Sequence, residues 1–170
     1  MTALNPTRRI GKQMVEVIRQ HQPLSRHEAQ QKAITLLEEM QIPDAKAVMA
    51  RYPFELSGGM RQRVMIALAF SCEPELIIAD EPTTALDVTV QAQILALLQQ
   101  LQQQLGLTYL FITHDLSTVR RIAHSVTVLR SGQVVEHGDV ETLFTSPQND
   151  YTRELIAAIP HFSPATEEFA

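Results

Sequence analysis

The sharpest chemical feature of the sequence is Ser57-Gly58-Gly59, which stands directly before an apolar-rich helix. A serine and two glycines at that place leave a hydroxyl and backbone amides exposed at the positive end of the helix dipole. This arrangement is suited to binding an anion such as a phosphate. The alternative is an ordinary serine N-cap, with the glycines serving only the turn.

A second feature is the acidic pair Asp80-Glu81, which ends a short apolar strand, and a third is His114, which ends the next one. An aspartate there could hold Mg²⁺ through water, and its neighbour could polarise an attacking water. The strand ends of an open parallel sheet meet at one edge, so these three side chains should converge. The alternatives are that Asp80 caps the next turn, that Glu81 is solvated, and that His114 is a hydrogen-bonded structural residue.

Hydrophobic spacing predicts the elements that position these residues. The first half of the chain is helical, with helices over Ile10–His21 and from a capping box at Ser25 and Glu28 to about Met40. A further helix follows Gly59 and runs to about Ser71.

The second half alternates strand and helix. Leu76–Ala79 and Tyr109–Ile112 read as strands buried on both faces, as in a parallel sheet. The helix between them has one apolar stripe and Gly106 as its C-terminal cap; the stripe consists of Ile94, Leu97, Leu98, Leu101 and Leu105. A hairpin over residues 126–136 and two short helices close an α/β chain.

Composition excludes several classes of protein. The 170 residues carry a net charge of −5, which argues against a general nucleic-acid binder. The single cysteine excludes an internal disulfide and a cysteine-built zinc cage. No apolar run approaches the ~18 residues of a membrane span, and residues 1–6 have no apolar signal core. These features favour the reducing cytoplasm.

Taken together, four strings resemble the nucleotide-binding subunit of an ABC transporter. The resemblance makes Leu56–Gly59 with Gln62 the signature motif, and Ile77–Asp80 the Walker B strand. It makes Glu81 the catalytic glutamate, Thr84–Asp87 the D-loop and His114 the switch histidine. Among the site residues that the resemblance implies, Glu81 and His114 are catalytic and Asp80 binds the metal. The nucleotide-binding residues are Ser57, Gly58, Gly59, Gln62 and Asp87.

The subgroup that the chain is most similar to imports dipeptides, oligopeptides, nickel or glutathione, on the strength of residues 1–6, 78–90 and 146–153. The resemblance implies the C-terminal part of a P-loop NTPase domain, in which a helical subdomain precedes a parallel-sheet core. Residues 1–55 would form the helical subdomain that docks on the membrane subunit. Residues 56–138 would form the core part, and residues 139–170 the C-terminal helices and tail.

The phosphate-binding pattern G-x-x-x-x-G-K-[ST] does not occur in these 170 residues, and neither does the Q-loop glutamine expected just ahead of Met1. We therefore expect an N-terminally truncated subunit: a shortened gene, a misplaced start codon or one piece of a split protein. Its cofactors would be ATP and Mg²⁺, and alone it would be inactive. The apolar strands next to the missing portion would be exposed.

The expected function is to couple ATP binding and hydrolysis to the import of peptides or a related solute. The expected partners are a second ATPase subunit or half, arranged head to tail, integral membrane permeases and, indirectly, a periplasmic solute-binding protein. The chain would then lie at the cytoplasmic face of the inner membrane. One alternative is a non-catalytic module that completes one site of a full-length partner ATPase. Another is an ABC ATPase of DNA repair or translation, which would need a coiled-coil insertion or a basic face.

Overall fold

The structure, a computed structural model, describes residues 4–84 and 86–159. The chain divides into two compact units, Met1–Ile112 and Thr113–Ala170. Both units combine helices with strands, as the α/β prediction requires. The functional division at residues 55 and 138 stays a prediction.

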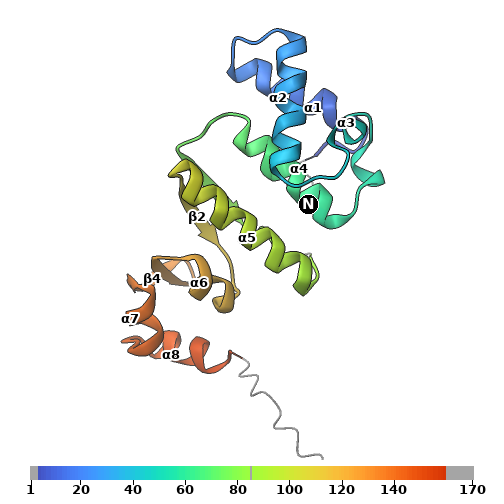
Figure 1. Cartoon of the computed structure of the whole chain (residues 1–170). Helices are drawn as coiled ribbons and strands as arrows, with labels where there is room; N and C mark the ends of the chain where they lie inside the picture. Colours follow the sequence, from blue (N-terminus) through green and yellow to red (C-terminus); the bar gives the residue numbers. More distant parts are fainter. Residues whose placement is uncertain (1–3, 85, 160–170) are drawn as a thin grey trace, which may run out of the picture. The chain divides into compact units, whose positions relative to one another are not determined.

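Unit 1 contains most of the helices (Figure 1). Its elements are α1 (Ile10–His21), α2 (Arg26–Glu39), α3 (Ala45–Val48), the 3-10 turn η1 (Pro53–Glu55), α4 (Gly58–Phe70), β1 (Leu76–Asp80), α5 (Val88–Leu105) and β2 (Thr108–Ile112). The predicted bounds of α1 are confirmed. The capping box is confirmed as well: Glu28 N donates to Ser25 Oγ at 3.3 Å, and Ser25 N donates to Glu28 Oε2 at 2.8 Å.

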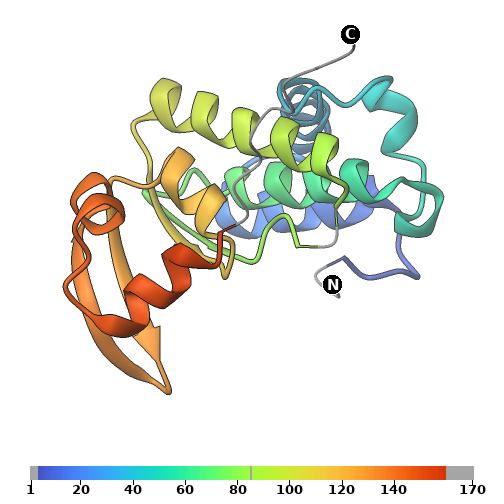
Figure 2. The same ribbon diagram turned by 90° about the horizontal axis from the view of Figure 1, so that it is seen from below.

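The core of unit 1 lies between α1, α2, α4 and α5, because each of these helices places an apolar stripe inward. Ile10, Met14, Ile18, Leu37 and Ile94 are fully buried there. The first turn of α1 is bonded to the segment after α3, since Ile10 N donates to Arg51 O at 2.8 Å. Helices α4 and α5 run side by side, as Figure 2 shows.

The two strands of unit 1 form a parallel pair, with Ile78 opposite Leu110 and Asp80 opposite Ile112. The prediction that both strands are buried on both faces is wrong for this structure. Ile77, Tyr109 and Phe111 pack against the core, but Leu76, Ile78, Leu110 and Ile112 on the other face are about half exposed or more. The physical reason is that no element of the described part of unit 1 covers that second face.

Helix α5 ends as predicted, at Gly106 in the left-handed conformation with φ 64°. A glycine adopts this conformation without the clash that a Cβ would cause. The predicted apolar stripe is confirmed from Ile94 to Leu101, but Leu105 is wrong, because it is 57% exposed in the last turn.

Unit 2 contains α6 (Leu116–Ile122), β3 (Ser125–Arg130), β4 (Gln133–Asp139), α7 (Val140–Thr145) and α8 (Asp150–Ala157). The predicted hairpin is confirmed: β3 and β4 are antiparallel, with an irregularity between Val128 and Leu129. The hairpin is joined to α8 by the Arg130 guanidinium, which lies 4.6 Å from the centroid of the Tyr151 ring.

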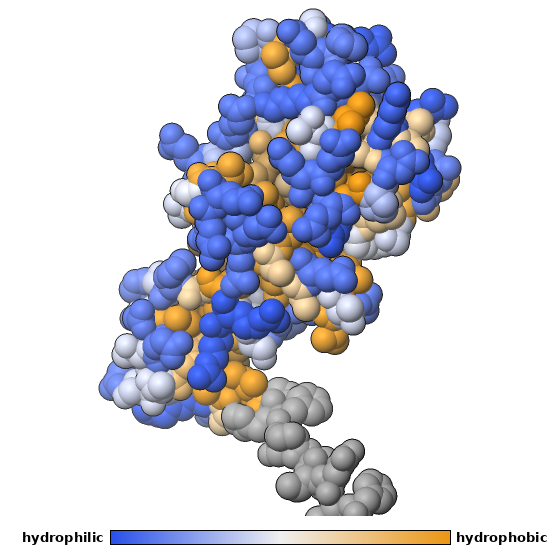
Figure 3. Space-filling view, viewed as in Figure 1, coloured by the Kyte–Doolittle hydropathy of each residue, from blue (hydrophilic) through white to orange (hydrophobic). Residues whose placement is uncertain are grey.

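The visible surface over α1 and α2 is mainly hydrophilic (Figure 3), in keeping with helices that bury a single stripe. Within residues 4–84 and 86–159, no helix has the length and apolar character needed to cross a membrane.

Candidate functional site

The exposed start of α4 is the centre of the candidate site. Ser57 is the N-cap residue, and its Oγ accepts a hydrogen bond from Met60 N at 3.2 Å. Ser57 and Gly58 are exposed, so the positive end of a 13-residue helix faces solvent at this point. The N-cap reading is therefore confirmed, and the same geometry leaves the end of the helix open to an anion.

Gly59 has a packing role that sequence reasoning missed. A Cβ built on Gly59 would lie 2.7 Å from Val90 Cγ1 in the first turn of α5, whereas one on Gly58 would lie 3.6 Å from Leu86. The starts of α4 and α5 thus approach so closely that a side chain at residue 59 would force Val90 to shift. The motif therefore contributes to helix packing in addition to any anion binding. Its local sequence spacing does not predict the packing role.

Replacing Gly59 by alanine is expected to lower the free energy of unfolding by about 1 kcal/mol. Overpacking costs about 1–3 kcal/mol, and the better helix propensity of alanine offsets up to about 1 kcal/mol of it. Urea denaturation measures the loss. In a double-mutant cycle, the loss caused by Gly59→Ala should be smaller in a Val90→Ala background, with a coupling energy of at least about 1 kcal/mol. A cycle without coupling would contradict the steric explanation.

Gln62 differs from Ser57 and Gly58 of the signature motif because it is buried. It is 5% exposed, and its Oε1 has no hydrogen-bond partner among the described residues. The predicted contact between Gln62 and a nucleotide stays a prediction, since the side chain does not share the exposure of Ser57. A buried amide oxygen without a partner carries a desolvation cost of about 1–3 kcal/mol, which a ligand or an additional segment could relieve.

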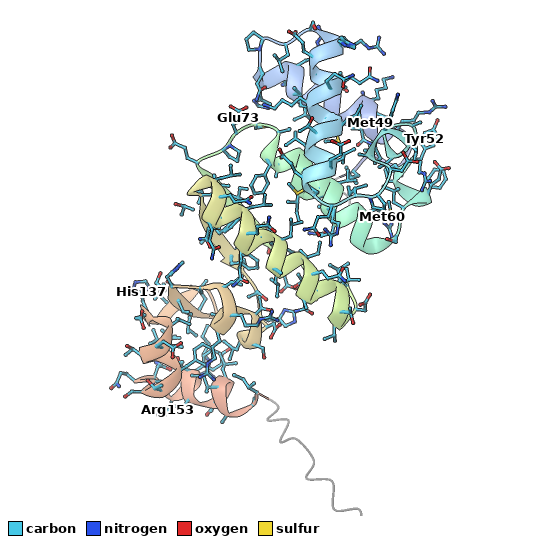
Figure 4. All side chains as sticks on the ribbon, viewed as in Figure 1. Met49, Tyr52, Met60, Glu73, His137 and Arg153 are labelled. Atoms are coloured by element: carbon cyan, nitrogen blue, oxygen red, sulfur yellow. The ribbon has the colours of Figure 1, made fainter. Side chains whose placement is uncertain are left out.

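Arg63 connects α4 to the C-terminal end of α2 through hydrogen bonds. Its Nη1 donates to Met40 O at 2.8 Å and to Gln41 Oε1 at 3.3 Å. Burial lowers the pKa of the guanidinium, which nevertheless stays charged at neutral pH. Three residues after α4, Glu73 forms an ion pair with Lys32 of α2. Figure 4 labels Met60 in the first turn of α4 and Glu73 beyond its last turn.

The acidic pair lies at the carboxyl end of β1. Asp80 is exposed, and Glu81 N extends the ladder by donating to Ile112 O at 2.8 Å. Glu81 adopts a left-handed conformation with φ 47°, and its Oε2 accepts a hydrogen bond from Thr84 Oγ1. A non-glycine residue held there costs about 1–3 kcal/mol, a strain found most often at functional sites. No local sequence signal predicts this conformation.

Asp87 caps α5. Its Oδ1 accepts from Val90 N at 2.9 Å, which gives this residue a structural role beside the predicted contact with a nucleotide. Thr83 of the preceding segment is buried, and its carbonyl accepts from Leu86 N at 3.1 Å. Ala85, a member of the predicted D-loop, lies outside the described residues. The alternative in which Asp80 caps this turn is not observed among the described residues, because Glu81 accepts the hydroxyl of Thr84 instead.

His114 belongs to unit 2, whereas the acidic pair belongs to unit 1. His114 is exposed and lies just before α6, whose N-cap is Asp115. Asp115 accepts from Ser117 N at 2.9 Å and from Thr118 Oγ1 at 2.6 Å. The convergence of His114 with Asp80 and Glu81 stays a prediction.

An exposed aromatic stack beside the motif was also missed. The rings of Tyr52 and Phe54 lie 5.5 Å apart and nearly parallel, and the Arg9 guanidinium lies 5.7 Å from the Tyr52 centroid. Phe54 is 70% exposed, three residues ahead of Ser57. The available sequence signal was two aromatic residues flanking a proline directly before the signature motif.

The comparisons with known sequences all find proteins of ABC transporters or their ATP-binding subunits. The sequence model of the ABC transporter family matches residues 2–84. The chain is 63% identical over 160 residues to the probable D,D-dipeptide transport ATP-binding protein DdpD of Escherichia coli K12, covering 94% of this chain and 49% of that protein. It is 54% identical over 160 residues to the glutathione import ATP-binding protein GsiA of the same strain, covering 94% of this chain and 26% of that protein. The chain thus spans half or less of the length of these curated relatives.

Comparison with solved structures agrees. The dimeric structure of MJ0796, a bacterial ABC transporter cassette, matches with a TM-score of 0.69 and 28% identity, covering 81% of this chain and 59% of that one. A post-hydrolysis dimer of the same cassette, bound to ADP and Pi, gives the same scores and coverage. The matched sequence, the fold and the motifs at α4 and β1 agree, and the chain belongs to the ABC transporter family.

Proposed function

We propose that the chain is part of an ABC-type ATPase that couples ATP binding and hydrolysis to the import of a peptide or a related small solute. The observation that carries the proposal is the exposed, serine-capped start of α4, which offers backbone amides to a phosphate. The similarity to DdpD and GsiA, whose names specify D,D-dipeptide transport and glutathione import, supports the class of solute.

In the proposed mechanism, two ATPase subunits or halves face each other head to tail. Ser57, Gly58 and Gly59 contact the terminal phosphate held by the facing subunit, and Gln62 and Asp87 support this contact. The dimeric cassette among the solved relatives supports the pairing. Phosphoryl transfer depends mainly on such positioning and on electrostatic stabilisation.

The two carboxylates at the end of β1 have different roles in this mechanism. Asp80 would hold Mg²⁺, and its exposed carboxylate fits that ion, which usually keeps several waters and binds one or two protein carboxylates. When bound, Mg²⁺ neutralises charge on the phosphates. Glu81 polarises the attacking water, while Thr84 orients its carboxylate through the hydroxyl hydrogen bond. His114 assists at the same phosphate.

The helical region of residues 1–55 would dock on a membrane permease and so place the ATPase at the cytoplasmic face of the inner membrane. A solute-binding protein on the other side would act through that permease. The stack of Arg9, Tyr52 and Phe54 lies in this region.

A second candidate function is a non-catalytic module that completes one site of a full-length partner ATPase. The observation in its favour is that the exposed start of α4 is present in these 170 residues, while the phosphate-loop pattern is not.

A polypeptide of these 170 residues alone is expected to bind ATP weakly and to hydrolyse none above background. The physical reason is that Glu81 has no phosphate held in front of it without a phosphate loop. Calorimetry with Mg-ATP and a phosphate-release assay test this expectation. Micromolar binding by the purified chain would contradict it. Adding a phosphate-loop half distinguishes the two candidate functions. ATP hydrolysis that is lost when Glu81 is replaced supports the ATPase over the non-catalytic module.

A further inference from the structure

The two glycines of the signature motif lie against the start of α5. A Cβ built on Gly59 would lie 2.7 Å from Val90 Cγ1, and the three nearest atoms of other segments all belong to Val90. A Cβ built on Gly58 would lie 3.6 Å from Leu86 Cδ2. Leu86 directly precedes the N-cap residue of α5, and Val90 belongs to the first turn of that helix. We call the side chains of Leu86 and Val90 the α5 ledge.

Several contacts fix the α5 ledge in place. Asp87 Oδ1 accepts from Val90 N at 2.9 Å, and Asp87 O accepts from Gln91 N at 2.8 Å, so the first turn of α5 is capped. Leu86 N donates to the carbonyl of the buried Thr83 at 3.1 Å. Both ledge side chains also pack on the hydrophobic core of unit 1. The ledge is therefore a well-supported surface beside the signature glycines.

The glycine backbone itself receives little support from α4. The first amides of an α-helix have no intrahelical acceptor, and the Ser57 hydroxyl accepts the amide of Met60, the third helical residue. Gly58 and Gly59 have no side chain with which to pack, so contact with the α5 ledge sets the position of their amides. Position matters here, because a misplacement of about 1 Å can cost about 10²-fold in rate.

We propose that Leu86 and Val90 are positioning residues for the phosphate contact. Their side chains set the place of the Gly58 and Gly59 amides, which meet the terminal phosphate held by the facing subunit. Leu86 and Val90 have apolar side chains that cannot donate to a phosphate, so their effect passes through the glycine backbone. The inference deepens the proposed function and rests on it.

The same geometry gives Asp87 an indirect part. A carboxylate is an acceptor without a donor and has the same sign of charge as a phosphate, so a direct contact between the two is unfavourable. The hydrogen bond that Asp87 makes with Val90 N instead orders the turn to which the ledge belongs. Asp87 therefore supports the phosphate contact through the cap of α5.

The test uses the chain completed by the phosphate-loop half of DdpD, in a Glu81→Gln background in which bound ATP is not turned over. Light scattering measures the ATP-driven closure of two such subunits, and calorimetry at protein concentrations below closure measures ATP binding to the phosphate loop. Val90→Ala should raise the protein concentration for half-maximal closure at least fivefold and change ATP binding less than twofold. Val90→Thr keeps the branched shape and should restore closure to within twofold of the wild-type value.

Leu101→Ala is the matched control for a loss of packing alone. Leu101 is 5% exposed and lies about three turns further along α5 than Val90. This variant should lower the melting temperature at least as much as Val90→Ala, while closure stays within twofold of the wild-type value. If the ledge contributed only to packing, closure would follow the melting temperature in both variants.

Four results would overturn the inference. They are failure of the wild-type complex to close on ATP, closure of Val90→Ala within twofold of the wild type, an equal loss of closure in Leu101→Ala, and failure of Val90→Thr to restore closure. The expected pattern of closure, combined with no ATP hydrolysis once Glu81 is restored, would leave this inference standing and refute the proposed function.

Discussion

In an ATPase completed by a phosphate-loop half, Glu81→Gln should lower the rate of ATP hydrolysis at least tenfold while nucleotide binding persists. A tenfold loss corresponds to about 1.4 kcal/mol of transition-state stabilisation. In the proposed mechanism the carboxylate polarises the attacking water and so acts in the transition state, whereas other groups hold the phosphates. Glutamine keeps the length of the side chain and an oxygen that can accept the Thr84 hydroxyl, so the left-handed turn at φ 47° should survive.

Single-turnover kinetics and nucleotide binding, measured on the same completed enzyme, separate the two effects. Ser57→Arg serves as the contrast, because an arginine at the exposed N-cap would block the facing site and weaken dimer closure itself. If Glu81→Gln kept more than about a tenth of the wild-type turnover, a loss below about 1.4 kcal/mol, the catalytic carboxylate would be another residue.

The largest effect on stability is expected from Gly11→Ala. A Cβ on Gly11 would lie 2.8 Å from Met49 O and 2.9 Å from Met49 Cε, and Gly11 N donates to the same carbonyl at 2.9 Å. Relief of this clash must move the backbone and weaken a buried hydrogen bond. We expect a loss of about 2 kcal/mol, since overpacking costs about 1–3 kcal/mol or more.

Thermal or urea denaturation measures the effect of Gly11→Ala. Gly138→Ala is the matched control, because nothing lies within 4 Å of a Cβ at that position. The control should stay within about 0.5 kcal/mol of the wild-type chain. Equal midpoints for Gly11→Ala and the wild-type chain would show that α1 and the segment after α3 are not as closely packed as in the structure.

Local signals account for the elements that were predicted well. The bounds of α1, the capping box at Ser25, the glycine cap at Gly106 and the hairpin each depend on side chains within a few residues of one another. Their physical causes are backbone amides that need acceptors, a left-handed turn that favours glycine, and alternation along paired strands. The prediction for Leu105 was wrong because apolar periodicity does not show where the core beside the helix ends.

The sequence by itself determined the family and most of the helices and strands, and it predicted Ser57, Asp80 and Glu81 as site residues, because residue types and spacing are local properties. Only the tertiary structure decided that Gly59 meets Val90, that Glu81 adopts φ 47°, and that one apolar face of β1 and β2 is open. Each of these depends on which surfaces meet across long stretches of chain. The sequence pattern of a strand with apolar residues on both sides is the same whether or not another element covers its second face.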